Sequence, residues 1–360
     1  MKIAFCFLIY DEINHEELWY RFFKSVDPNK YSIYIHYKTQ KLLKYFEKYK
    51  LPNCIPTKYA DVSLVHAHNL LFRTAFESDP RNYKFINLSG ACIPLKSFDH
   101  IYKFLTKDHF GYFNMHLLSS YYPRYNKLLN KFPIQSILKS CEWFILNRDL
   151  VKILAYVDTY IINNLYNAIY APEESYFITF IKKYNMENQI KTTYHESDNS
   201  TTFTCWQHTM NYKYANKNIR GLKNYETITT DEIAHLLQSP ALFGRKFNKN
   251  CTITNLPNIN FDTYIYNRLS EYVHNYIGII GIANKSFQCN ILPLHLSAFE
   301  MEKGVKNNNT IINSISSFEP KITHHAPKII HNNNHVRPLH IENVKKKQKP
   351  KYSKMRMYNL

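Results

Sequence analysis

The sequence predicts an α/β protein with a mostly parallel sheet and helices on both of its faces. Short apolar runs rich in β-branched and aromatic residues lie at residues 3–10, 31–37 and 84–88, which is typical of buried strands. Between them, residues 16–24 and 62–76 carry apolar side chains at helical spacing. Strands that alternate with helices over short connections favour a parallel sheet.

The later part of the chain continues this alternation. We expect strands at residues 142–146 and 201–207, and helices at residues 148–158, 173–183 and 230–237. Sheets of this class bind ligands at the carboxyl ends of their strands. The turns at Asp11, Lys38 and Ser89-Gly90 are therefore the places where we expect a nucleotide.

Composition and charge divide the chain into three expected segments. Its 360 residues include 30 Tyr and 23 Phe, enough apolar surface for a sizeable core. The formal net charge is +18, of which +9 belongs to residues 301–360. We expect an α/β domain at 1–250, a helical extension packed on it at 251–300, and a disordered, low-complexity basic tail at 301–360.

Several kinds of site have no pattern in this sequence. There is no Gly-rich phosphate loop, no G-x-S-x-G, no H-E-x-x-H and no Asp-x-Asp. The seven cysteines are widely spaced without a CxxC pair, so we expect reduced thiols. His66 and His68 diverge on the predicted helix, which disfavours a shared metal. The apolar run at 3–10 is too short to span a bilayer.

Five blocks occur in a recognisable order along the chain. They are Phe85–Leu95 (FINLSGACIPL), Arg124-Tyr125-Asn126, Lys139–Phe144 (KSCEWF), Ala171–Glu174 (APEE) and Leu242–Phe247 (LFGRKF). With the runs at 3–10 and 31–37, they resemble the core-2/I-branching enzymes of glycosyltransferase family 14, whose blocks read LSESCIPL, GRYN, KGSQWF, PDE and LFARKF. The resemblance covers roughly residues 3–250 and is closest to the plant-like and microbial or viral branch.

The resemblance implies a GT-A-like, Rossmann-type domain that transfers a sugar from a UDP-sugar to a hydroxyl of a glycan or glycoprotein, with inversion. The sugar is usually N-acetylglucosamine, as in a β-1,6-N-acetylglucosaminyltransferase. Family members work without the Asp-x-Asp metal site of most GT-A enzymes. The resemblance therefore implies no metal and no other cofactor, in keeping with the missing Asp-x-Asp.

The family's Pro-Asp-Glu block implies the catalytic base. Glu174 matches its glutamate and would accept the proton of the acceptor hydroxyl, while Glu173 takes the place of the aspartate. The segment Pro172-Glu173-Glu174 also fits a plain helix start with acids near the positive end of the dipole. Both interpretations hold together.

The resemblance also implies the groups that bind the leaving diphosphate. Lys246 matches the family lysine that neutralises this charge in place of a metal, and Arg245 precedes it. Arg220 is the best match by spacing to a second basic residue of the family. That alignment is loose, because three lysines lie near Arg220: Lys213, Lys217 and Lys223.

Six further residues are candidates for the nucleotide and sugar site: Tyr37, Ser89, Gly90, Cys92, Glu142 and Trp143. Tyr37 stands where animal members have an aspartate that contacts uracil, so stacking on the base is the alternative. Trp143 and Phe144 either line the sugar site, as aromatic faces do, or pack in the core.

Two other functions stay open at this point. A basic nucleic-acid-binding protein fits the charge, although no nucleic-acid-binding motif occurs and such binding is expected only weakly, through the tail. An inactive glycan-binding relative is the second. Animal members are anchored in the Golgi by an N-terminal membrane helix, which this sequence lacks. We therefore expect a soluble protein, in the cytoplasm of an AT-rich protist or of a cell infected by a large virus, or in the virion.

Overall fold

The computed structural model describes residues 1–115, 123–194, 200–208 and 212–270, all within one compact unit, Met1–Gln288. The expected tail and most of the expected extension lie outside the described residues. The helices are α1 (Glu16–Lys24), α2 (Val62–Ser78), α3 (Phe98–Thr106), α4 (Arg148–Leu154), α5 (Thr159–Tyr166), α6 (Glu173–Lys183) and α7 (Thr230–Gln238). The strands are β1 (Lys2–Ile9), β2 (Tyr31–Tyr37), β3 (Asn82–Ser89), β4 (Ile93–Pro94), β5 (Gly111–Met115), β6 (Ile145–Asn147), β7 (Ile190–Tyr194), β8 (Thr202–Thr204), β9 (Tyr225–Ile228), β10 (Phe243–Arg245) and β11 (Phe247–Ile253).

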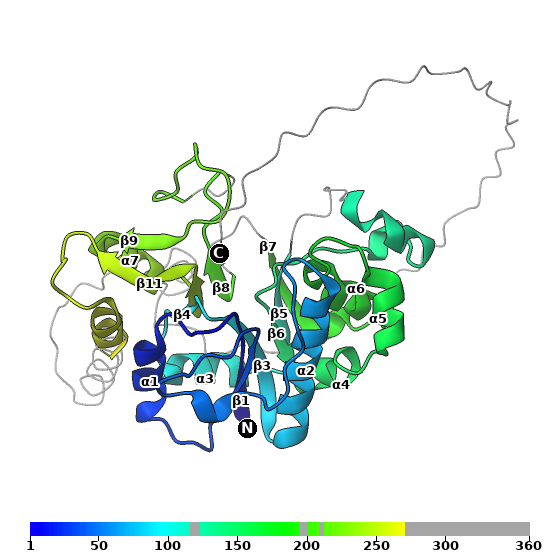
Figure 1. Ribbon diagram of the computed structural model, residues 1–360, viewed down its shortest axis with the longest axis horizontal. Coiled ribbons are helices and arrows are strands. Elements are labelled where there is room, and N and C mark those ends of the chain that lie inside the picture. Colours follow the sequence, from blue (N-terminus) through cyan, green and yellow to red (C-terminus); the bar gives the residue numbers. More distant parts are fainter. Residues whose placement is uncertain (116–122, 195–199, 209–211, 271–360) are drawn as a thin grey trace, which may run out of the picture. The chain divides into compact units, whose positions relative to one another are not determined.

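Six of these strands form the central sheet, in the order β2-β1-β3-β6-β5-β7 (Figure 1). Strand β1 is parallel to β2 and β3, and β5 is parallel to β7, whereas β6 is antiparallel to both of its neighbours. The predicted fold class, a mostly parallel α/β sheet, is confirmed. Two smaller sheets, β4-β10-β8 and β11-β9, follow.

Helices cover both faces of this sheet. Ala4 and Cys6 of β1 belong to the core shared with α2, α4, α5 and α6, whereas Phe5 and Phe7 belong to the core shared with α1 and α3 (Figure 1). Both sets are fully buried. A strand covered on both sides must be apolar on both sides, which is why residues 3–10 form a continuous apolar run.

Three elements are shorter than expected. The strand predicted at 201–207 is confined to Thr202–Thr204. The strand predicted at 142–146 is confined to Ile145–Asn147, so the first three residues of that range form a loop before it. The helix predicted at 148–158 ends at Leu154. Asp158 instead begins the next helix, because its carboxylate accepts a hydrogen bond from the N–H of Tyr160 at 2.6 Å and caps α5.

The chain beyond residue 250 packs on the same unit as far as it is described. Strand β11 crosses the expected boundary at 250, and residues 261–270 are helical. Phe261 is buried in the core that β11 and α7 share, and Asp262 Oδ1 lies 2.6 Å from His15 Nδ1. The division into three segments stays a prediction.

Candidate active site

The first three strands end beside one another at one edge of the sheet. Tyr37 of β2 lies opposite Ile9 of β1, and Ser89 of β3 lies opposite the residue before Ile9. A Cβ at Gly90 would lie 2.3 Å from the carbonyl oxygen of Glu12, so the turns after β3 and β1 are in close contact. The turns that the sequence indicated therefore meet where α/β sheets bind ligands.

Tyr37, Ser89 and Cys92 are fixed by contacts within these turns. The N–H of Ser89 donates to Cys92 Sγ at 3.3 Å, and burial raises the pKa of the Cys92 thiol, which is thus a neutral packing group. Tyr37 is half-buried, with Lys50 Nζ 5.0 Å from the centroid of its ring. Contacts of these residues with a donor stay predictions.

Glu174 is oriented by two cations at the start of α6. Its Oε2 accepts a hydrogen bond from Arg124 and lies 3.5 Å from Lys139 Nζ. The carbonyl oxygen of Glu174 accepts a hydrogen bond from the N–H of Ser140 at 2.8 Å, which ties the loop of Lys139 to the helix. The Glu174 side chain is 23% exposed. Oε1 takes no part in these contacts and is left for another partner.

Two further carboxyls interact with Glu174. Burial raises the pKa of Glu142 to about 7; Arg245 opposes this rise, and the charge of Glu174 adds to it. Burial also raises the pKa of Glu173 well above its usual range, and the charges of Glu142 and Glu174 add to the rise. Glu173 is therefore protonated at neutral pH, and Glu142 is partly protonated.

Arg245 and Lys246 are adjacent cations at the end of β10. The guanidinium carbon of Arg245 lies 3.9 Å from the centroid of the Trp143 ring, and Arg245 Nε is buried without a hydrogen-bond partner among the described residues. Burial lowers the pKa of both side chains, and the charge of Arg245 lowers that of Lys246 further. In the described part of the chain, neither forms an ion pair. Glu142 offsets part of the charge of Arg245. Charge that is only partly compensated costs free energy, which an anionic ligand would offset.

The structure places three other predicted residues differently. Arg220 is exposed on the loop before β9 and forms no hydrogen bond or ion pair with the described residues. Trp143 is buried, and Arg245 covers its ring. Phe144 is fully buried, its ring stacked 5.0 Å from that of Phe113. Of the two alternatives for Phe144, the structure therefore supports packing in the core, because the fold directs this side chain there.

The sequence analysis gave no role to four residues near the carboxyls of Glu173 and Glu174. Arg124 and Lys139 lie in two of the blocks that resemble the family. Their place in these blocks is the signal from which a role at the site could have been predicted. The hydroxyls of Tyr59 and Tyr170 are 3.5 Å apart on largely exposed rings. Their hydrogen bond raises the pKa of Tyr59 to about 12, and the charges of the neighbouring carboxyls add to this. Among 30 tyrosines, nothing in the sequence singles out these two.

The protein is thus an α/β protein with a charged site at the carboxyl ends of its strands. The sequence model of the Core-2/I-Branching enzyme family matches residues 3–236, and the chain belongs to that family of glycosyltransferases. Glycosyltransferase BC10 of Oryza sativa subsp. japonica is 21% identical over 163 residues, 42% of this chain and 40% of the rice protein. The match thus spans about two fifths of that relative's length.

Two solved structures are weakly similar. One is a glycosyltransferase involved in the glycosylation of the major capsid of PBCV-1, with 13% identity and a TM-score of 0.31 over 67% of this chain and 94% of that chain. The other is the apo structure of the bifunctional glycosyltransferase WbbM, with 9% identity and a TM-score of 0.35 over 74% of this chain and 51% of that chain.

Two features are absent from the described residues. No three His, Cys, Asp or Glu side chains there are grouped so that they would hold a metal ion. Nor does that part of the chain contain a helix both long and apolar enough to cross a membrane. None of the six cysteines in it forms a disulfide with another described cysteine, and Cys289 lies outside it.

Proposed function

We propose that this glycosyltransferase moves a sugar, N-acetylglucosamine in the first instance, from a UDP-sugar to a hydroxyl of a glycan, with inversion and without a metal ion. One observation carries the proposal in this member of a glycosyltransferase family: the oriented carboxylate of Glu174 and the cation of Arg245, which precedes Lys246, both act on the charge of Glu142.

Glu174 is the general base of this proposal. The acceptor oxygen attacks the anomeric carbon from the face opposite the leaving group, and a single displacement of this kind inverts the configuration. The acceptor proton passes to Glu174, whose Oε1 is left open by the contacts of Oε2 with Arg124 and Lys139. The two cations hold the carboxylate in place, so the base needs no reorientation during the reaction.

Arg245 and Lys246 stabilise the leaving group. As the bond between the anomeric carbon and the diphosphate oxygen breaks, its electron pair moves onto that oxygen. Fixed positive charge lowers the free energy of this transition state. Arg220, which is exposed on the loop before β9, is the third cation of this proposal.

Hydrolysis and transfer of a panel of UDP-sugars in the presence of EDTA test this function. We expect UDP release that increases when a glycan acceptor is added. Activity that appears only with added manganese contradicts the metal-independent part. Hydrolysis that no acceptor accelerates contradicts the transferase part, and an absence of UDP release from every sugar in the panel favours a glycan-binding relative.

A further inference from the structure

Two exposed tyrosines, Tyr59 and Tyr170, meet edge to face although they are far apart in the sequence. Their rings are 75% and 55% exposed, the ring centroids lie 6.2 Å apart, and the ring planes are inclined at 74°. The two hydroxyl oxygens lie 3.5 Å apart. Single exposed aromatic side chains are common on proteins. Two that contact each other and stay open to solvent form a small apolar surface with hydroxyls at its edge.

The backbone holds the two tyrosines in place. Each is followed by an alanine in the left-handed region, Ala60 with a φ of 52° and Ala171 with a φ of 51°. The N–H of Ala171 donates to the carbonyl oxygen of Ala60 at 3.0 Å, and the hydroxyl of Tyr125 donates to the carbonyl oxygen of Ala171 at 3.4 Å. Residues other than glycine adopt this conformation at a cost in free energy, and such residues cluster at functional sites. The turns that carry the two rings are thus joined and preorganised.

Contacts join this aromatic pair to the carboxylate of Glu174. The guanidinium carbon of Arg124 lies 5.9 Å from the centroid of the Tyr170 ring, which is within the range of a cation–π contact. Arg124 also donates a hydrogen bond to Oε2 of Glu174. The charge of Glu174 contributes to the raised pKa of Tyr59. One side chain, Arg124, therefore contacts both the aromatic pair and the proposed base.

We propose that Tyr59 and Tyr170 bind the acceptor glycan: a sugar ring packs its C–H face on these aromatic rings, which brings the attacking hydroxyl to Oε1 of Glu174. This inference rests on the function proposed above. A pyranose ring carries C–H bonds on one face, which suit the electron-rich face of an aromatic ring, and its hydroxyls exchange hydrogen bonds with the tyrosine hydroxyls. The donor diphosphate requires cations, whereas the cation beside Tyr170, Arg124, is already paired with Glu174. The two tyrosines therefore suit the neutral substrate.

Steady-state kinetics test this inference, with the best donor of the UDP-sugar panel and with methyl β-galactoside, methyl β-glucoside and methyl β-xyloside as acceptors. The methyl group does not itself stack on an aromatic ring. Tyr59→Ala and Tyr170→Ala each remove one ring, and we expect either to raise the KM of the acceptor by about 10-fold while the KM of the donor stays level. Tyr59→Phe and Tyr170→Phe keep the ring faces and should raise the acceptor KM by less. Tyr160→Ala on α5, at a ring that is 74% exposed, is the matched control and should behave as the wild type.

The outcomes separate the inference from the proposed function. A wild-type acceptor KM in both alanine variants overturns the inference and leaves the function standing. A rise confined to the KM of the donor does the same, because it would assign the tyrosines to the nucleotide. Equal losses in the phenylalanine and alanine variants overturn the stacking contact, and failure of the wild type to transfer to any of the three acceptors overturns the inference and the function together.

A second pair of variants decides if thermal unfolding shows that an alanine variant is not folded. Tyr59→Trp keeps an aromatic face, whereas Tyr59→Leu keeps apolar bulk without one. We expect the acceptor KM to stay near the wild-type value in the first and to rise in the second. An equal acceptor KM in the two variants overturns the inference.

Discussion

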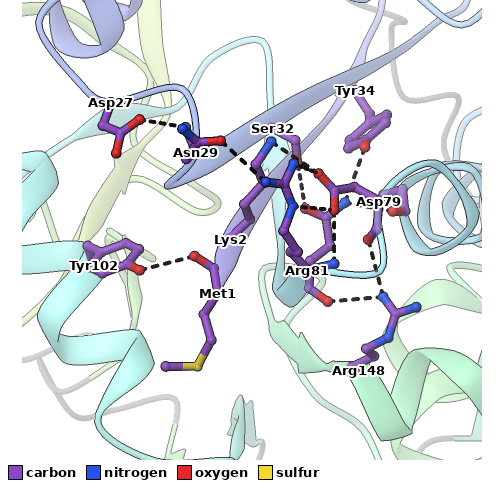
Figure 2. Close-up of polar contacts among 12 residues, drawn as sticks. Met1, Lys2, Asp27, Asn29, Ser32, Tyr34, Asp79, Arg81, Tyr102 and Arg148 are labelled. Carbon is purple, nitrogen blue, oxygen red and sulfur yellow. Dashed lines mark hydrogen bonds and ion pairs between the residues drawn. The ribbon is translucent and has the colours of Figure 1, made fainter.

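The two ends of the central sheet differ in how their charges are balanced. At the amino ends of β1 and β3, Asp79 accepts two hydrogen bonds from the Arg81 guanidinium and lies 3.1 Å from Lys2 Nζ (Figure 2). Arg148 donates to the carbonyl oxygens of Asp79 and Asn82. The charges of Lys2, Asp79, Arg81 and Arg148 are all matched by polar groups here.

The carboxyl ends leave part of their charge unmatched. Arg245 Nε and Glu173 Oε2 are buried without hydrogen-bond partners, and neither Arg245 nor Lys246 has an ion pair with the described residues. A satisfied polar network stabilises a fold, whereas an unsatisfied one costs free energy. Proteins retain that cost where a ligand supplies the missing partner. The comparison predicts that substitutions at the carboxyl ends change activity and that those at the amino ends change stability.

The largest effect is expected for Glu174→Gln. The amide keeps the shape of the side chain but does not accept the acceptor proton. We expect kcat for sugar transfer to fall by about 10³-fold, while thermal unfolding remains cooperative. Initial rates with a UDP-sugar and an acceptor measure this. Glu77→Gln, on the exposed part of α2, is the control and should keep full activity. An unchanged kcat for Glu174→Gln would remove Glu174 as the base.

Lys246→Met tests the unpaired cations. We expect kcat/KM to fall by about 10²-fold, because the developing charge on the diphosphate loses a fixed partner. The free energy of unfolding should stay level or rise, since the substitution removes a half-buried charge that has no counter-ion among the described residues. Steady-state kinetics and urea unfolding measure the two effects.

Lys191→Met is the matched control for Lys246→Met. Lys191 Nζ lies 2.7 Å from Asp108 Oδ2 at the surface, so this variant should keep its activity and lose a little stability. If Lys246→Met instead lowers stability and leaves kcat/KM unchanged, Lys246 is structural, and the contrast between the two ends of the sheet fails.

Sequence patterns located the first half of the sheet but not all of the second. Strands β1, β2 and β3 are long apolar runs, whereas β5 (Gly111–Met115) is five residues, all buried, and includes Asn114. The carbonyl oxygen of Asn114 accepts a hydrogen bond from the N–H of Cys141, a partner that no local pattern indicates. Strand β7 (Ile190–Tyr194) reads as polar. In a chain rich in Tyr, Asn and Lys, polar and apolar positions are poorly separated, so short strands are missed.

The site was predicted where residues adjoin in sequence and missed where they meet only in space. Glu174 and Lys246 lie in blocks that the sequence displays, and their roles stay predictions. Arg124 orients Glu174 across a separation of 50 residues. Neither spacing nor composition indicates such a pair, because the fold alone brings the two side chains together.

A smaller effect is expected for a backbone contact, rather than a charge, at the carboxyl ends of the strands. Gly90→Ala places a Cβ 2.3 Å from the carbonyl oxygen of Glu12, which must move. We expect the free energy of unfolding to fall by about 2 kcal/mol, as urea unfolding would measure. Gly244→Ala is the control, since its Cβ meets only side chains, Leu95 at 3.1 Å and Phe247 at 3.3 Å, and no backbone atom at such close range, so it should cost less. Equal costs would show that the turns are not tightly packed.

The smallest effect belongs to the matched charges at the amino ends. Hydrogen bonds from Arg81 hold the pKa of Asp79 well below its usual range. A lowered carboxyl pKa contributes stability that is present above the unfolded value of about 4 and is lost as the pH falls toward the folded value.

Asp79→Asn should therefore cost about 1 kcal/mol at pH 7, a small amount because solvent screens the site, and kcat should stay at the wild-type value. The difference in urea midpoint between variant and wild type should shrink as the pH falls below about 4, where Asp79 of the unfolded chain begins to be protonated while Asp79 of the folded protein is still ionised. Loss of activity in Asp79→Asn without loss of stability would reverse the roles of the two ends of the sheet. A stability difference that persists unchanged at pH 2 would mean that packing, and not charge, holds this cluster together.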